Sequence, residues 1–201
     1  MTVQLTIFSD FACPFCFIGK GIVDHFRDEF GIEDLWLPHE LHPETPPEGR
    51  DLVELFDRFD IDQVTMTCNL RGKPYGIRFG EMTRLPNTRL ALETAEFARD
   101  KGRFREFHGR MYRAIFTEGR DIGDPAVILA VAEASGLDPE ELAPALADHR
   151  FAARVAEGSE AARRAGVTAL PTFVIKGGRT ITGAVDETQF RNALQEAANS
   201  D

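Results

Sequence analysis

The feature that most constrains the fold is a pair of cysteines at the point where a strand pattern changes into a helix pattern. Residues 3–8 are a short run of branched and aromatic side chains, as in a largely buried strand. Cys13 and Cys16 follow, and an amphipathic pattern runs from Pro14 to about Gly31. Proline suits the first turn of a helix, where its missing N–H would be unpaired anyway. The chain must therefore bring a strand end, two thiols and a helix start together.

This arrangement predicts thiol-disulfide chemistry. Only a thiolate attacks a disulfide, and a helix N-terminus lowers a cysteine pKa from about 8.5 to roughly 3.5–7.5. We therefore predict that Cys13 is the nucleophile. Cys16 lies one helical turn later and can resolve a mixed disulfide held on Cys13. Pro14 and Phe15 add no charge, so the backbone must stabilise the thiolate, and both are predicted to contact the substrate.

The rest of the chain divides into three parts. A second strand is predicted over 34–41, and the following segment, 42–49, holds three of the eleven prolines, which marks a surface connection. From about 50 to 165 we predict only helices, among them segments over 52–59 and 64–70. Strand patterns return at 166–175 and 180–182, and a last helix follows.

The predicted order is β-α-β, many helices, then β-β-α. We predict an α/β fold with an all-helical insertion between the second and third strands. The insertion covers 46–159, and the discontinuous α/β domain covers 1–45 and 160–201.

Aspartates followed directly by proline, or by glutamine three residues later, mark several helix starts. Asp124, Asp138 and Asp186 are predicted N-caps, and Asn87 or Thr88 is predicted to cap another helix.

Pro171 lies at the start of a strand pattern, where a trans proline would remove a hydrogen-bond donor unless it came first in the strand. We predict that the Leu170–Pro171 peptide bond is cis. Such a bond turns the backbone of Leu170 outward, where an extended substrate can pair with it beside Cys13.

Charge and hydropathy exclude several function classes. A formal net charge of -10 disfavours nucleic acid and anionic lipid as partners. With 43% hydrophobic and 28% charged residues, no segment approaches the apolar run of about 20 residues that spans a membrane. No secretory signal is visible at the start of the sequence.

Three segments together resemble a known family. Residues 9–20 (Ser-Asp-Phe-Ala-Cys-Pro-Phe-Cys-Phe-Ile-Gly-Lys), residues 166–173 and Thr182-Gly183-Ala184 are similar to the FrnE branch of the DsbA-like thiol-disulfide oxidoreductases. The resemblance spans essentially the whole chain. It implies a thioredoxin-like fold with a helical insertion, a nucleophile at Cys13, a resolving thiol at Cys16 and a cis-proline at Pro171.

The sequence departs from this family at two positions. Phe15 replaces the histidine of the founding enzymes, and Ile7 occupies the place where many thioredoxin-fold enzymes carry a buried acid. The resemblance implies protein thiols and disulfides, or small thiols, as partners. It implies no cofactor, although glutathione is an expected co-substrate for some relatives. Without a visible leader, we expect a cytoplasmic protein, and its oligomeric state, a homodimer included, is left open.

The sequence leaves other interpretations open. A zinc site would need Cys68 with His39 or His42 beside the cysteine pair, and no second paired spacing supplies it, so no metal is predicted. Cys68 is interpreted as a buried, inert thiol. His25, His108 and His149 are interpreted as surface or helix-end residues. The aromatic residues around the nucleophile, Phe11, Phe15 and Phe17, are expected to form an apolar surface.

Two functions compete with disulfide exchange. The first is a glutathione-dependent transferase or isomerase, similar to kappa-class glutathione transferase and 2-hydroxychromene-2-carboxylate isomerase, which needs no resolving thiol. The second is a redox-inert binding module. The presence of Cys16 favours disulfide exchange.

Overall fold

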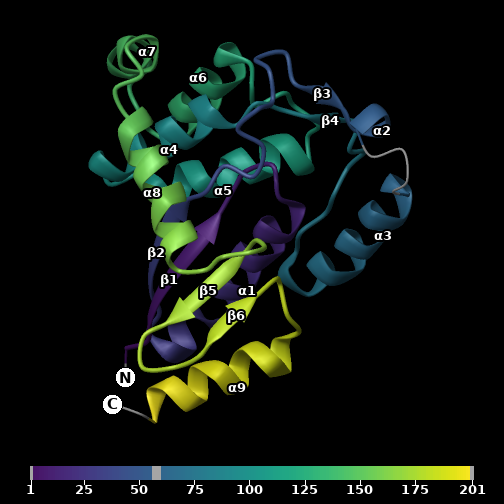
Figure 1. Ribbon diagram of the computed structural model, residues 1–201, viewed down its shortest axis with the longest axis vertical. Coiled ribbons are helices and arrows are strands. Elements are labelled where there is room, and N and C mark those ends of the chain that lie inside the picture. The colour runs from purple at the N-terminus through teal and green to yellow at the C-terminus, as the bar shows by residue number, and fades with distance from the viewer. Residues whose placement is uncertain (1, 56–59, 200–201) are drawn as a thin grey trace.

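The computed structural model describes residues 2–55 and 60–199. Its centre is a four-stranded mixed sheet in the order β2-β1-β5-β6 (Figure 1). The strands are β1 (Gln4–Ser9), β2 (Glu33–Pro38), β5 (Thr172–Ile175) and β6 (Thr180–Thr182). β1 pairs with β2 in parallel and with β5 antiparallel. The sheet therefore joins segments from both ends of the chain, as the predicted order requires.

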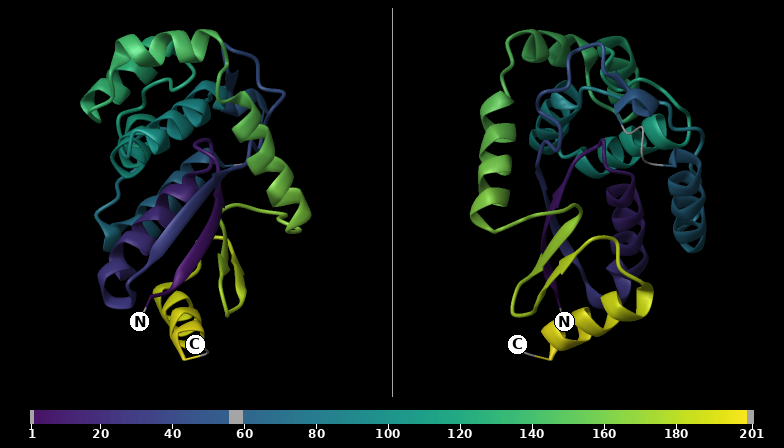
Figure 2. Two further views of the ribbon diagram at one scale, coloured as in Figure 1. Left: turned by 90° about the vertical axis from the view of Figure 1, so that its left-hand side faces the viewer. Right: turned by 45° about the vertical axis from the view of Figure 1, so that its right-hand side comes forward.

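Helix α1 (Pro14–Phe30) leaves the end of β1 that carries the cysteines. Cys13 is its N-cap residue, Pro14 is in its first turn, and Gly31 ends it with a left-handed φ of 56°. Ile18, Ile22 and other apolar residues of one stripe are buried. The last helix, α9 (Glu187–Ala198), contacts α1 and β5, whereas α8 (Ala152–Arg164) packs on β2 from the other side of the sheet (Figure 2).

The insertion forms the upper part of the molecule in Figure 1. Its remaining helices are α2 (Leu52–Leu55), α3 (Ile61–Gly72), the 3-10 helix η1 (Lys73–Tyr75), α4 (Arg89–Asp100), α5 (Phe104–Phe116), α6 (Pro125–Ala134) and α7 (Pro139–Ala147). The all-helical prediction for 46–159 misses two short strands, β3 (Arg50–Asp51) and β4 (Arg84–Leu85), which pair antiparallel. A strand of two residues shows no alternation in the sequence.

The capping predictions hold at three helices. The side chains of Asp124, Asp138 and Asp186 each accept a hydrogen bond from a backbone N–H in the first turn that follows. At α4 the side chain of Asn87 accepts from the N–H of Arg89, at 3.0 Å.

Other boundaries differ from the prediction. β2 ends at Pro38: the N–H of His39 still donates to Ser9 of β1, but those of Glu40 and Leu41 donate to side chains. Of the predicted strand 166–175, only β5 pairs in the sheet. In the predicted helix 52–59, residues 56–59 lie outside the described residues. The predicted boundary at 159/160 falls within α8, and the division into two domains stays a prediction.

Candidate active site

The two cysteines of the motif lie at the first turn of α1. Cys13 is 6% exposed and Cys16 is fully buried, and both are free thiols. The Cys13 and Cys16 side chains lie close enough to interact. Burial raises the pKa of Cys16 well above its ordinary value, and the contact with Cys13 raises it further. The first turn of α1 carries no acidic residue, and the acid beside this turn is Asp10, three residues before Cys13.

A distant segment completes the surroundings of Cys13. Its Sγ lies 3.6 Å from the carbonyl oxygen of Leu170, to which it donates, 157 residues along the chain. The Leu170–Pro171 peptide bond is cis. Gly19 allows this approach, because a Cβ there would lie 2.9 Å from both Pro171 and Phe173. The fold therefore brings together Cys13, Cys16, Leu170 and Pro171.

The aromatic residues near the motif differ in exposure. Phe15 is half-buried, and the guanidinium of Arg71 lies 5.6 Å from its ring centroid. Phe11 and Phe17 are 1% and 6% exposed, so the prediction that they form a surface is wrong. They pack on Tyr112 instead, Phe17 in a stacked arrangement at 5.5 Å. The sequence around the cysteines could not predict this burial, because the ring that covers Phe11 and Phe17 is Tyr112 of α5.

Asp10 is a buried residue of the site to which the sequence analysis gave no role. It is 1% exposed, and its carboxylate accepts hydrogen bonds from the N–H groups of Ala12 and Leu41, at 3.2 and 2.7 Å. The Thr88 side chain also hydrogen-bonds to it. Burial raises the pKa of Asp10, and these hydrogen bonds oppose that shift. Asp10 thus ties the cysteine loop to the exit of β2 and to the start of α4. The sequence signal that could have identified Asp10 is its position directly after the buried strand β1.

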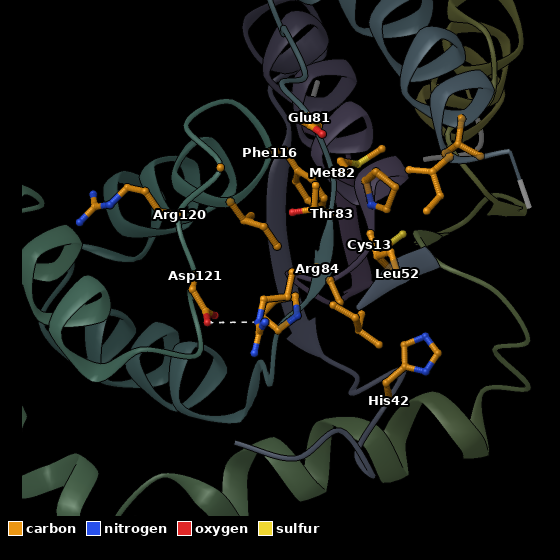
Figure 3. Close-up of a pocket in the computed structure, with 18 of the residues that line it drawn as sticks. Cys13, His42, Leu52, Glu81, Met82, Thr83, Arg84, Phe116, Arg120 and Asp121 are labelled. Carbon is orange, nitrogen blue, oxygen red and sulfur yellow. Dashed lines mark ion pairs between the residues drawn. The ribbon is translucent and has the colours of Figure 1, made fainter. Parts of the chain in front are cut away.

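A cavity of about 370 Å³ opens beside Cys13 (Figure 3). Its walls come from the cysteine loop, α2, α3, the segment before α4 and the end of α5. Apolar side chains dominate these walls, including Leu41, Leu52, Val64, Met82 and Ile115. The charged part of the lining is the ion pair of Arg84 and Asp121, whose Nε and Oδ2 atoms lie 3.6 Å apart. Of the two residues of the motif predicted to contact the substrate, Pro14 lines the cavity and Phe15 does not.

Segment 86–88 lies close to the site. Pro86 lines the cavity, and Thr88 contacts Asp10. Besides capping α4 through Asn87, this segment therefore also contacts the candidate active site.

The remaining thiol and the histidines take structural positions. Cys68 is fully buried, as predicted, and burial together with nearby Cys13 raises its pKa to about 11. Within residues 2–55 and 60–199, no group of three or more His, Cys, Asp or Glu side chains could hold a metal ion.

His108 is not at the surface, so that prediction is wrong: it is 4% exposed among aromatic rings, and burial holds its pKa well below the ordinary value. His25 is half-exposed, and His149 pairs with the buried Glu93 at 2.9 Å.

Comparisons with known proteins agree with this geometry. The model of the DSBA-like thioredoxin domain family matches residues 4–195. The chain belongs to the DsbA-like thioredoxin domain family. A curated relative, the uncharacterized protein YwbO of Bacillus subtilis, is 30% identical over 98% of both chains.

Solved structures show the same DsbA-like fold. The probable DsbA oxidoreductase SCO1869 from Streptomyces coelicolor has a TM-score of 0.90 at 23% identity, covering 99% of this chain and 91% of its own. A 2-hydroxychromene-2-carboxylate isomerase has a TM-score of 0.76 at 16% identity, with 98% and 100% covered. The cytosolic disulfide reductase DsbM from Pseudomonas aeruginosa, also solved with GSH, has a TM-score of 0.68 at 18% identity, with 97% and 94% covered. The α/β thioredoxin-like fold with its insertion is thereby confirmed.

Among the described residues, no helix has the length and apolar character needed to cross a membrane.

Proposed function

We propose that this protein catalyses thiol-disulfide exchange, with Cys13 attacking and Cys16 resolving. The observation that carries the proposal is the position of the Cys13 thiol. It lies at the N-terminus of α1, beside the Leu170 carbonyl, and borders a cavity open to another molecule.

The reaction has two steps. The Cys13 thiolate attacks one sulfur of a substrate disulfide, forming a mixed disulfide and releasing the other substrate sulfur as a thiolate. Cys16 then gives its proton to the released substrate thiolate and attacks the Cys13 sulfur. The bond between Cys13 and the substrate breaks, the second substrate sulfur leaves as a thiolate that takes a proton from water, and a Cys13–Cys16 disulfide remains. The raised pKa of Cys16 keeps it protonated at the start, so that Cys13 attacks first.

The surroundings favour an extended or apolar substrate. The Leu170 carbonyl accepts from the Cys13 thiol and loses that donor when Cys13 ionises, so it could then accept from an added strand; the apolar cavity can bury a side chain next to the reacting sulfur. Pro14 lines the same cavity, and the half-buried Phe15 follows it on the first turn of α1. We infer protein thiols and disulfides as substrates, small thiols such as glutathione as redox partners, the FrnE branch as the subgroup, and the cytoplasm as the compartment.

Serine substitutions test the proposal. We expect Cys13→Ser to abolish the reduction of insulin disulfides, and Cys16→Ser to accumulate a mixed disulfide on Cys13. Cys68→Ser is the matched control, because Cys68 is equally buried but lies outside the motif, and it should keep full activity. Full activity of Cys13→Ser would refute the proposal.

The cavity also supports the second candidate, a glutathione-dependent isomerase or transferase. At about 370 Å³ it lies within the range of about 300–1,000 Å³ typical of small-molecule sites. Such an enzyme needs no resolving thiol. Isomerase or transferase turnover with glutathione that survives Cys16→Ser, together with no turnover of protein disulfides by the wild type, would favour it.

A further inference from the structure

A second hollow, of about 540 Å³, lies between the middle of α1, residues 74–78 and the end of α5. We call it the α1–α5 hollow. Three cationic side chains line it, those of Lys20, Arg78 and Arg113, against one carboxylate, that of Asp24. In a chain with a formal net charge of -10, this is a local excess of the opposite sign.

Two of the three cations have no partner of their own. Within the part of the chain that the structure describes, the guanidinium groups of Arg78 and Arg113 form no hydrogen bond or ion pair. Both side chains are exposed. Each therefore keeps its full set of N–H donors for a ligand.

The third cation is held in place. The Lys20 side chain is only 15% exposed, and a Cβ at Gly109 of α5 would lie 3.1 Å from its Cε. Its aliphatic part thus packs against α5, and its ammonium group pairs with Asp24. Arg113 follows one helical turn after Gly109, so Lys20 and Arg113 belong to one face of the hollow.

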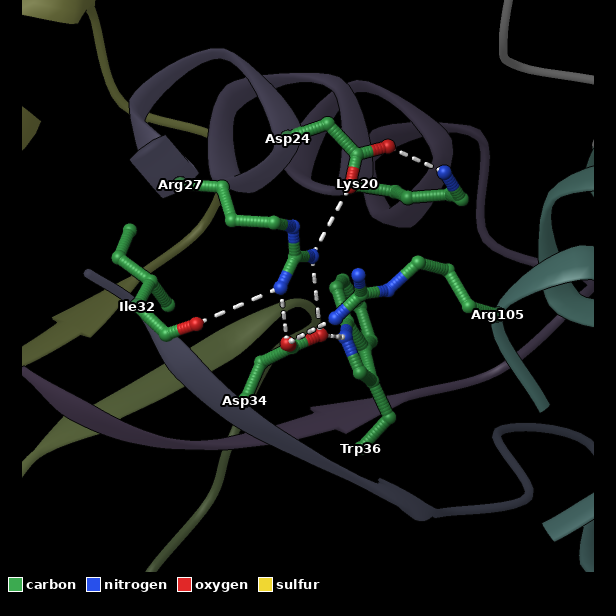
Figure 4. A network of polar contacts seen from close by, with 7 residues as sticks. All are labelled: Lys20, Asp24, Arg27, Ile32, Asp34, Trp36 and Arg105. Atoms are coloured by element: carbon green, nitrogen blue, oxygen red, sulfur yellow. Dashed lines mark hydrogen bonds and ion pairs between the residues drawn. The ribbon is translucent and has the colours of Figure 1, made fainter. Parts of the chain in front are cut away.

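Asp24 does not neutralise this face by itself, because a second cation shares it (Figure 4). Arg27 donates to Asp24 at 3.0 Å and also pairs with Asp34, which a further cation, Arg105, approaches at 3.4 Å. Two further carboxylates, those of Asp186 and Glu187, lie near Tyr75 without lining the hollow, and Glu187 is 3.7 Å from His25.

We propose that the α1–α5 hollow binds a small phosphate-bearing molecule. Guanidinium groups recognise phosphate oxygens through paired N–H donors, and Lys20 adds a point charge. The hollow is concave, and the half-buried ring of Tyr75 offers apolar surface for the organic part. The overall negative charge repels a long polyanion, so a small ligand fits better than nucleic acid.

Inorganic pyrophosphate is a direct probe of this site. Isothermal titration of the full-length wild-type chain, at a constant ionic strength of about 0.15 M, should show saturable binding of one pyrophosphate per chain. Arg78→Gln and Arg113→Gln should each weaken binding by about 10-fold or more, since each removes charge-assisted hydrogen bonds. The rate of Cys13 alkylation should not change in either variant, which separates this site from the redox site.

Arg110→Gln is the matched control. Arg110 lies on the same helix and is likewise exposed and unpaired among the described residues, but it does not line the hollow. It should bind pyrophosphate within about twofold of the wild type. No saturable binding to the wild type would overturn the proposal. An equal loss in Arg110→Gln and Arg113→Gln would also overturn it, because binding would then follow net charge alone.

Discussion

Asp34 lies on β2 at the edge of the sheet, where its carboxylate connects three side chains (Figure 4). It accepts a hydrogen bond from Nε1 of Trp36 at 2.6 Å, pairs with Arg27, and lies 3.4 Å from Arg105. The side chain of Asp34 is 9% exposed and Trp36 is 3% exposed. We expect Asp34→Ala to destabilise the fold more than the loss of a surface charge does.

The magnitude follows from what the substitution leaves behind. The buried Trp36 N–H loses its acceptor, which costs about 1–3 kcal/mol. Arg27 keeps Asp24 and the Ile32 carbonyl as partners, and its side chain is 16% exposed. Losing the Arg27–Asp34 ion pair therefore costs about 1 kcal/mol and not the roughly 3–5 kcal/mol of a fully buried pair. The total is about 2–4 kcal/mol, or about 4–16 °C in Tm for a chain of this size.

Urea unfolding of the wild type, Asp34→Ala and Asp24→Ala measures this. Asp24 also pairs with Arg27 but is 39% exposed, so its removal should cost at most about 1 kcal/mol. If Asp34→Ala costs no more than Asp24→Ala, the reasoning is refuted.

The effect also depends on pH. Burial acts to raise the pKa of Asp34, but the hydrogen bond and charge of Arg27 outweigh it, and the folded-state pKa is lowered. The stabilisation is therefore present above the unfolded pKa of about 3.9 and is lost as the pH falls through the folded value.

Three further predictions concern the site and its supports. Burial raises the folded-state pKa of Asp10, so its contribution to stability is complete below the unfolded pKa and is lost as the pH rises through the folded value. Urea unfolding of the wild type from about pH 3 to pH 8 should show this dependence, and Asp10→Asn should abolish it. Gly158→Ala should lower the free energy of unfolding by about 1–3 kcal/mol, because its Cβ would lie 2.4 Å from the Pro38 carbonyl oxygen. Gly109→Ala should cost less, because its Cβ would meet a side chain, that of Lys20, at 3.1 Å and no backbone atom; equal losses would contradict this. With a pKa of about 11, Cys68 should resist iodoacetamide in the folded protein at about pH 8, and rapid labelling seen by mass spectrometry would show that the thiol is accessible.

Local signals in the sequence predicted the part of the site built from neighbouring residues. The strand β1, the helix α1 and the place of Cys13 at its start follow from apolar periodicity and from Pro14. Aspartate caps fixed helix starts at Asp124, Asp138 and Asp186 for the same reason, since a cap acts within one turn.

Features that depend on distant segments were not predicted. The burial of His108 and Phe11 comes from rings on other elements, and periodicity cannot show which elements meet. Met66 and Leu70 fit a helical pattern, yet both are more than 70% exposed on α3, whose buried residues are Cys68 and Gly72. The role of Asp10 required Leu41 and Thr88 to be placed beside it.

The central claim is that Cys13 and Cys16 form a redox pair. Equilibrating the wild-type protein in glutathione redox buffers and mapping its disulfides by mass spectrometry tests this claim most directly. We expect one reversible disulfide that joins Cys13 to Cys16 while Cys68 stays a free thiol. A protein whose two motif thiols never form that bond at any buffer potential, or which pairs Cys68 instead, would contradict the account.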